Sequence, residues 1–314
     1  MRRPLLLAAT TAVTAFGARR LRPRLLDRPI PRRVQEPFDG EIFAAGEAAV
    51  GVRTATGNPR AVVICMHGFL EDMRYFGALY RDPTLTYLGI NSGGYHIPDG
   101  EQPRREADWA TDNPYTPGTI AYDAWVLNEA LAHWRGQARV RVHGHSRGGA
   151  VVVEAARQRP EAFAEAEVIL EAPVLPGGAV AAALGTGATG AGEFLLPFSL
   201  AAARQVPVTQ AAPWLFRPLS SRKRELLDPM LYTPRTDRIT LVNVMNLRDW
   251  MRMTPPAALE TLPQGCVLIP QTDRILDRQA MLTAARRAPG LRVVETTGTS
   301  HFISLDAPAL IPPL

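Results

Sequence analysis

The most informative feature of this chain is Ser146, which lies in Gly144-His145-Ser146-Arg147-Gly148. This segment fits the pattern Gly-x-Ser-x-Gly, which is typical of a serine that acts as a nucleophile. The run at 139–143 before it is typical of a β-strand, and residues 149–159 after it predict a helix. A strand, a sharp turn and a helix around Gly-x-Ser-x-Gly form a nucleophile elbow, whose small residues leave the serine hydroxyl free to meet a base. Ser146 is therefore the candidate nucleophile.

A serine hydroxyl is a weak nucleophile until a base takes its proton, so a histidine must lie nearby. His301 is the last histidine of the chain and follows a predicted strand at 291–295. Asp273 follows another predicted strand, at 266–270, and the carboxyl ends of parallel strands are where open sheets build their sites. We expect Asp273 to fix the tautomer of His301 and to stabilise its protonated form.

Two further acids remain open for the role given to Asp273. Glu171 directly follows a predicted strand at 168–170. Asp277 is also near, but it is better placed as the N-cap of a helix that begins near Arg278.

A tetrahedral intermediate also needs two N–H donors for its oxyanion. The elbow offers the amide of Arg147, the residue after the nucleophile. His67-Gly68-Phe69 follows a predicted strand at 61–66, and we expect Phe69 to supply the second amide.

These residues, in this order, resemble the α/β-hydrolase-fold serine hydrolases of the esterase and lipase type, over about residues 40–310. The resemblance implies an α/β fold with a mostly parallel central sheet, flanking helices and a lid insertion after the sixth strand. It implies Ser146 as nucleophile, His301 as base, Asp273 as acid, and Phe69 with Arg147 as oxyanion donors. One departure is the stretch 91–95, where relatives often carry Asp-x-x-Gly-x-Gly.

Alternating strand and helix patterns also predict a parallel α/β sheet. Beyond the strands above, we expect a strand pair at 41–54, a helix near 72–81, a strand near 86–90, a helix at 117–134 and a strand at 166–170. The predicted organisation is a leader and linker at 1–37, a core at 38–172 and 257–314, and a lid at 173–256.

The substrate pocket is expected from two insertions. Tyr95 and His96 lie in a long polar loop at 91–116, and loops of this length often carry function. Phe194 and Phe198 lie in the apolar part of the lid. If these side chains face the nucleophile, the substrate carries a hydrophobic acyl or alkyl group; the alternative is that they pack the insertions onto the core.

The net charge of +5 is unevenly distributed. Residues 1–33 hold nine arginines and one acid, which leaves the remainder slightly acidic and without a footprint for nucleic acid. The apolar run at 5–18 fits a poor signal peptide, an anchor at the membrane surface or a disordered leader. Export or peripheral membrane contact is favoured over a purely cytoplasmic location, and the oligomeric state stays open.

The chemistry predicted is hydrolysis of an ester or thioester through an acyl-enzyme, with no cofactor. Acyl transfer, amide hydrolysis and carbon–carbon bond hydrolysis use the same triad, and a non-catalytic binding protein on this scaffold is a further alternative. No residues have metal-ligand spacing, so no metal is expected. Cys65 and Cys266 each lie in an apolar strand and are expected as buried free thiols.

Overall fold

The computed structural model describes residues 17, 19–33, 36–98, 105–182 and 190–314. An eight-stranded sheet runs through the molecule in the order β1-β2-β4-β3-β5-β6-β7-β8. β1 and β2 form an antiparallel edge, and the other strands are parallel to one another, as predicted. The strands are β1 (Glu41–Ala45), β2 (Ala48–Arg53), β3 (Ala61–Met66), β4 (Leu85–Asn91), β5 (Arg139–His145), β6 (Glu167–Glu171), β7 (Gln264–Ile269) and β8 (Leu291–Glu295).

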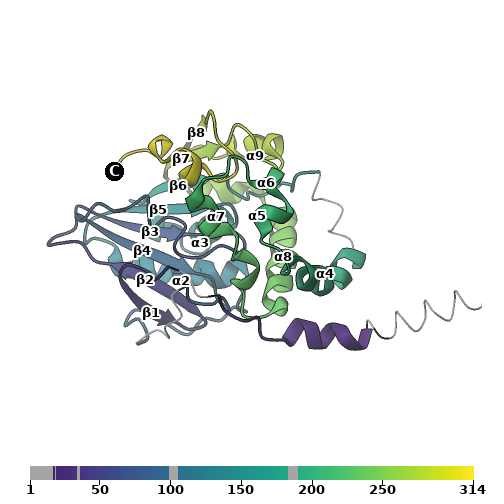
Figure 1. Cartoon of the computed structure of the whole chain (residues 1–314). Coiled ribbons are helices and arrows are strands. Elements are labelled where there is room, and N and C mark those ends of the chain that lie inside the picture. Colours follow the sequence, from purple (N-terminus) through teal and green to yellow (C-terminus); the bar gives the residue numbers. More distant parts are fainter. Residues whose placement is uncertain (1–16, 18, 34–35, 99–104, 183–189) are drawn as a thin grey trace, which may run out of the picture.

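Helices flank this sheet, and those between β6 and β7 gather beside one end of it (Figure 1). The α-helices are α2 (Ile120–Trp134), α3 (Arg147–Gln158), α4 (Gly190–Ala203), α5 (Val208–Ala211), α6 (Pro213–Phe216), α7 (Ser221–Leu227), α8 (Asp237–Met253), α9 (Arg278–Ala285) and α10 (Ile303–Asp306). Short 3₁₀ helices are η1 (Pro160–Phe163), η3 (Met230–Tyr232), η4 (Pro256–Thr261) and η5 (Pro308–Leu310). No helix among the described residues is long and apolar enough to cross a membrane.

The central strands are buried on both faces, which explains their nearly continuous apolar sequences. Every residue of β3 is buried, and β5 is buried from Val140 onward. Cys65 in β3 and Cys266 in β7 are buried and unpaired, as predicted. The helix predicted at 117–134 forms as α2, which begins after Thr119, whose hydroxyl accepts from the amide of Tyr122.

The helix expected near 72–81 is absent, and that prediction was wrong. Successive turns form there instead, with bonds from Tyr75 N–H to the Asp72 carbonyl and from Gly77 N–H to the Arg74 carbonyl. The Asp72 carboxylate accepts from both the amide and the guanidinium of Arg74. Such local side-chain bonds compete with helix formation, and Gly77 weakens it further.

We call residues 173–256, between β6 and the region of η4, the cap segment. Part of the amino-terminal stretch packs on it: residues 19–27 are helical and lie beside α4 (Figure 1). Asp27 forms an ion pair with Arg238, and the amide of Ile30 donates to the carbonyl of Arg235. The basic stretch is therefore attached to the cap segment from residue 19 onward, and the apolar run at 5–18 lies outside the described residues except for Gly17.

The closest approach between layers occurs where α3 begins beneath the end of β3. A Cβ at Gly148 would lie 2.0 Å from the carbonyl oxygen of Met66, and one at Gly144 would lie 2.6 Å from the Gly148 carbonyl oxygen. Any side chain at these positions would push α3 away from the sheet. The sequence Gly-x-Ser-x-Gly is thus required by packing at this turn.

Replacing Gly148 by alanine should lower the free energy of unfolding by about 2–3 kcal/mol, because the added methyl group overlaps backbone that cannot move aside. Urea denaturation measures this. Gly77→Ala is the matched control, since its nearest neighbour would be at an ordinary 3.4 Å. Equal unfolding midpoints for the two variants would contradict the packing argument.

Candidate active site

Ser146 lies at the sharp turn between β5 and α3. Its φ is 51° and its ψ is −117°, a conformation that non-glycine residues rarely adopt and that indicates strain. The residue is 6% exposed. Within the described residues its hydroxyl makes no hydrogen bond, which leaves it available to a base or a substrate.

His301 and Asp273 are joined by a direct hydrogen bond. Nδ1 of His301 lies 2.7 Å from Oδ2 of Asp273, and both side chains are nearly inaccessible to solvent. The other carboxylate oxygen accepts from the amides of Ile275 and Leu276, each at 2.8 Å. Burial opposes the charge of Asp273, but His301 and these amides outweigh it and lower its pKa. The carboxylate is therefore held ionised and aimed at the imidazole.

The two other acids considered from the sequence have different partners. Asp277 caps α9, as predicted, and accepts from the amide of Ala280 at 2.8 Å. Glu171 accepts from the Tyr75 hydroxyl at 2.8 Å and from the amide of Ser304 at 2.7 Å. Asp273 is thus the acid that this geometry brings to His301.

Glu171 remains charged although it is completely buried. Burial alone would raise its pKa, but His143, His145 and the bonds from Ser304 outweigh burial and lower the pKa to about 2. This carboxylate fastens α10, which begins two residues after His301, to the end of β6. Its position favours a structural role behind the candidate base.

His145, next to Ser146, is held between two acceptors. Its Nδ1 lies 3.0 Å from Oε2 of Glu71, and its Nε2 lies 3.0 Å from the carbonyl oxygen of His301. The carbonyl can only accept, so Nε2 carries hydrogen, and the carboxylate beside Nδ1 favours a second proton there. Burial disfavours this charge, but Glu71 outweighs it and raises the pKa of His145 to about 9.

The Glu71–His145 pair joins the segments that carry the candidate chemistry. Glu71 also accepts from the amide of Gly68 at 2.7 Å, in the loop that follows β3. The imidazole of His145 stacks on Tyr75, with ring centroids 4.3 Å apart and an interplanar angle of 7°. Through these contacts one buried ion pair fixes the loop at 67–69, the end of β5 and the backbone of His301 relative to one another.

The two predicted oxyanion donors both have N–H groups that lack an acceptor within the described residues. Arg147 is the first residue of α3, and the first amides of a helix have no partner inside it. Phe69 lies between amides that are satisfied: Gly68 donates to Glu71, and Leu70 donates to the Tyr95 hydroxyl at 3.3 Å. An oxyanion site needs two such unpaired N–H donors.

The side chain of Arg147 secures the elbow from the opposite side. It is fully buried and donates to Asp123 of α2 at 2.7 Å and to Ser92 Oγ at 3.2 Å. Asp123 also accepts from the amide of Gly93 at 3.0 Å. The unusual stretch at 91–95 therefore wraps around an ion pair that holds the start of α3.

Tyr95 and His96, predicted to line the substrate pocket, have other contacts in the structure. Tyr95 is 1% exposed and supports the candidate oxyanion loop through Leu70, and burial raises its pKa to about 12. The imidazole of His96 donates to the carbonyl of Ile30 at 2.9 Å, in the amino-terminal stretch. These contacts join neighbouring segments, and a role of either side chain in binding substrate stays a prediction.

Phe194 and Phe198 lie on α4 and contact each other, with ring centroids 6.3 Å apart. The guanidinium of Arg22 lies 5.6 Å from the centroid of Phe194. Phe194 is therefore at least partly covered by the amino-terminal helix, an arrangement that the sequence did not suggest. Leu200 of α4 forms an apolar cluster with Leu70 and Leu231, and Phe69 and Leu196 pack against that cluster.

Lys223, the single lysine of the chain, ties α7 of the cap segment to the segment around His301. Its completely buried ammonium donates to Ser300 Oγ at 2.9 Å and to Asp306 at 2.8 Å. Burial lowers its pKa against the opposing effect of Asp306. Sequence reasoning missed Lys223, Glu71 and Tyr75, because each acts on a partner far away in the chain and carries no local motif.

Comparison with known proteins places the chain among hydrolases. The model of the Alpha/beta hydrolase family matches residues 62–311. An esterase from Exiguobacterium antarcticum has a TM-score of 0.63 at 15% identity, covering 85% of this chain and 94% of the other. An esterase from Thermogutta terrifontis has a TM-score of 0.57 at 18% identity, covering 89% and 94%.

A deformylase of N-formylmaleamic acid from Pseudomonas putida is similar at a TM-score of 0.57 and 15% identity, covering 83% of this chain and 92% of that one. No curated protein matches the chain. At these identities the solved structures establish the fold alone.

The free energy of unfolding should depend on pH through His145. Its folded pKa of about 9 exceeds the ordinary value of 6.5, so its contribution is complete below pH 6.5 and is lost as the pH rises through 9. This loss amounts to about 3 kcal/mol, at about 1.4 kcal/mol per pKa unit. Glu71→Gln should flatten the fall, as measured by urea denaturation at pH 6 to 9.5.

Glu165→Gln is the control for this measurement, because Glu165 is exposed on the surface. It should keep the wild-type pH dependence. A Glu71→Gln protein whose stability falls as steeply as that of Glu165→Gln would show that His145 is not charged.

Proposed function

The chain belongs to the alpha/beta hydrolase family, and within that family we propose that it is a serine hydrolase of carboxylic esters or thioesters. The observation that carries the proposal is the strained turn at Ser146, with φ of 51° at the start of α3. Strain of this kind is kept where function needs a side chain in one position. In this proposal His301 is the base that such a serine requires, and its hydrogen bond to Asp273 supports that role.

In the proposed mechanism His301 takes the proton of Ser146 as the hydroxyl attacks the substrate carbonyl. Asp273 keeps the Nδ1–H tautomer of His301 and stabilises the imidazolium that forms. The amides of Phe69 and Arg147 donate to the oxyanion. His301 then protonates the leaving group, and water repeats the sequence to release the acid from Ser146.

The choice of an ester draws support from the esterases among the structural relatives. We further propose a hydrophobic acyl group. Phe69 of the candidate oxyanion loop packs against a cluster formed by Leu70, Leu200 of α4 and Leu231, so the surroundings of this loop are apolar. In this proposal the cap segment acts as the lid, with α4 as its contact to the core.

The wild-type protein should hydrolyse p-nitrophenyl esters, and a series from acetate to palmitate should show a maximum that reports the length of the acyl pocket. Ser146→Ala should reduce the rate by a factor of about 10³ or more, because no other group can form the acyl-enzyme. Ser221→Ala, at an exposed position on α7, is the control and should match wild type. Full activity in Ser146→Ala, or no activity of the folded wild type on any ester, would refute the proposal.

Asp273→Asn should lower kcat by about 10³–10⁴-fold, since an amide no longer enforces the required tautomer of His301. Asp277→Asn is the same substitution on the same loop, and asparagine caps a helix as well as aspartate does. Its activity should therefore be close to that of wild type. Steady-state kinetics decide between them, and an equal loss in both variants would show that Asp273 acts only through the structure of this loop.

A further inference from the structure

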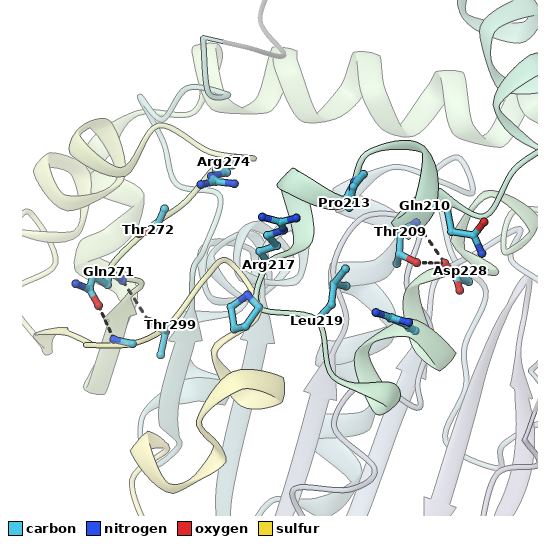
Figure 2. A pocket seen from close by; sticks show the side chains of 13 residues that line it. Thr209, Gln210, Pro213, Arg217, Leu219, Asp228, Gln271, Thr272, Arg274 and Thr299 are labelled. Atoms are coloured by element: carbon cyan, nitrogen blue, oxygen red, sulfur yellow. Dashed lines mark hydrogen bonds between the residues drawn. The ribbon is translucent and has the colours of Figure 1, made fainter.

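A cavity of about 850 Å³ lies between the cap segment and the loops that follow β7 and β8 (Figure 2). Its walls come from α5, α6 and α7 on one side and from Gln271, Thr272 and Thr299 on the other. Ser146 does not line it, and neither do Asp273 and His301. The cavity is thus next to the candidate active site without being part of it.

Charge in this cavity is predominantly positive. Arg217, Arg224 and Arg274 line it together with one acid, Asp228. Asp228 already accepts from the amide of Thr209 at 3.2 Å and from its hydroxyl at 2.5 Å. Figure 2 shows Arg217 between the segment of Gln271 to Arg274 and the pair formed by Thr209 and Asp228.

The arginines of the cap segment that line this cavity differ from the others in that segment, because they lack an ion pair with a carboxylate. Most arginines of the cap segment form an ion pair with a carboxylate: Arg204, Arg222, Arg235, Arg238, Arg248 and Arg252. The remaining two, Arg217 and Arg224, have no carboxylate partner in the described part of the chain, and both line the cavity.

Arg274, on the opposite wall, is likewise without a carboxylate among the described residues. Its guanidinium donates to the carbonyl of Trp214, which leaves other N–H groups available. Guanidinium groups bind carboxylates and phosphates through paired hydrogen bonds, and a concave surface of one sign concentrates ligands of the opposite sign.

From these observations we propose that the cavity is a binding site for a small anionic molecule that carries carboxylate or phosphate groups. Arg217 and Arg224 bind the anion from the cap segment, and Arg274 binds it from the loop after β7. Gln271 and Thr299, which both line the cavity, join the loop after β7 to the loop after β8, because the backbone amide of Gln271 donates to the Thr299 hydroxyl at 3.1 Å. The site therefore borders the segments that carry Asp273 and His301.

Isothermal titration calorimetry with inorganic phosphate, succinate and uncharged 1,4-butanediol tests this proposal on the full-length protein. Phosphate or succinate should bind saturably, the stronger one identifying the anion class, and butanediol should not bind. Arg217→Gln/Arg224→Gln should weaken binding about tenfold or more, and Arg224→Gln alone should weaken it by a smaller factor. Higher salt should weaken binding further.

Two control variants test whether the anion binds in this cavity. Arg286→Gln/Arg287→Gln removes the same charge from an exposed position at the end of α9 and should leave the affinity unchanged. Ser146→Ala should also bind the anion as wild type does, whatever the outcome of the esterase assay. The proposal is overturned if neither anion binds, if both double variants weaken binding equally, or if Ser146→Ala abolishes it.

Discussion

The buried ion pair between Glu71 and His145 is the interaction on which the geometry of the candidate site depends. A charged imidazole in the interior is costly unless every donor has an acceptor, and here Glu71 and the carbonyl of His301 provide them. Because His145 directly precedes Ser146, the pair links the candidate nucleophile, the backbone of the candidate base His301 and the loop of Phe69. Removing either partner would leave an uncompensated charge, so loss of one is expected to disturb all the segments that the pair joins.

A second buried pair supports the turn from the other side. Arg147 and Asp123 connect the start of α3 to α2 and to the stretch at 91–95. The strained φ of Ser146 is thus over-determined by ion pairs on both sides of it and by the close packing at Gly148. This explains how an energetically unfavourable conformation persists at the point where a hydroxyl must be presented.

Much of this could be predicted from the sequence, because the signals were local. The elbow is contained in five residues, and the strands before Asp273 and His301 are apolar runs with clear ends. The choice between Asp273 and Glu171 could not be made this way, because both follow strands and only the fold brings one of them to His301.

Side-chain contacts explain the remaining differences. The sequence does not single out His145, since nothing near it in the chain reveals Glu71 as its partner. Phe194 was expected either to face a substrate or to pack the insertion onto the core, and the structure adds Arg22 of the amino-terminal helix over its ring. The helix expected near 72–81 failed because bonds between Asp72 and Arg74 favour turns. In each case the deciding factor is a specific side-chain interaction that the pattern of the segment does not reveal.

The central claim is that Ser146 is an activated nucleophile, and covalent labelling tests it most directly. The folded protein would be treated with a fluorophosphonate ester, which reacts with activated serines and not with ordinary ones, and the modified peptide identified by mass spectrometry. The account predicts one adduct per chain, on Ser146, and a much slower reaction in Asp273→Asn. An unlabelled protein, or an adduct on another residue with Ser146 unmodified, would contradict it.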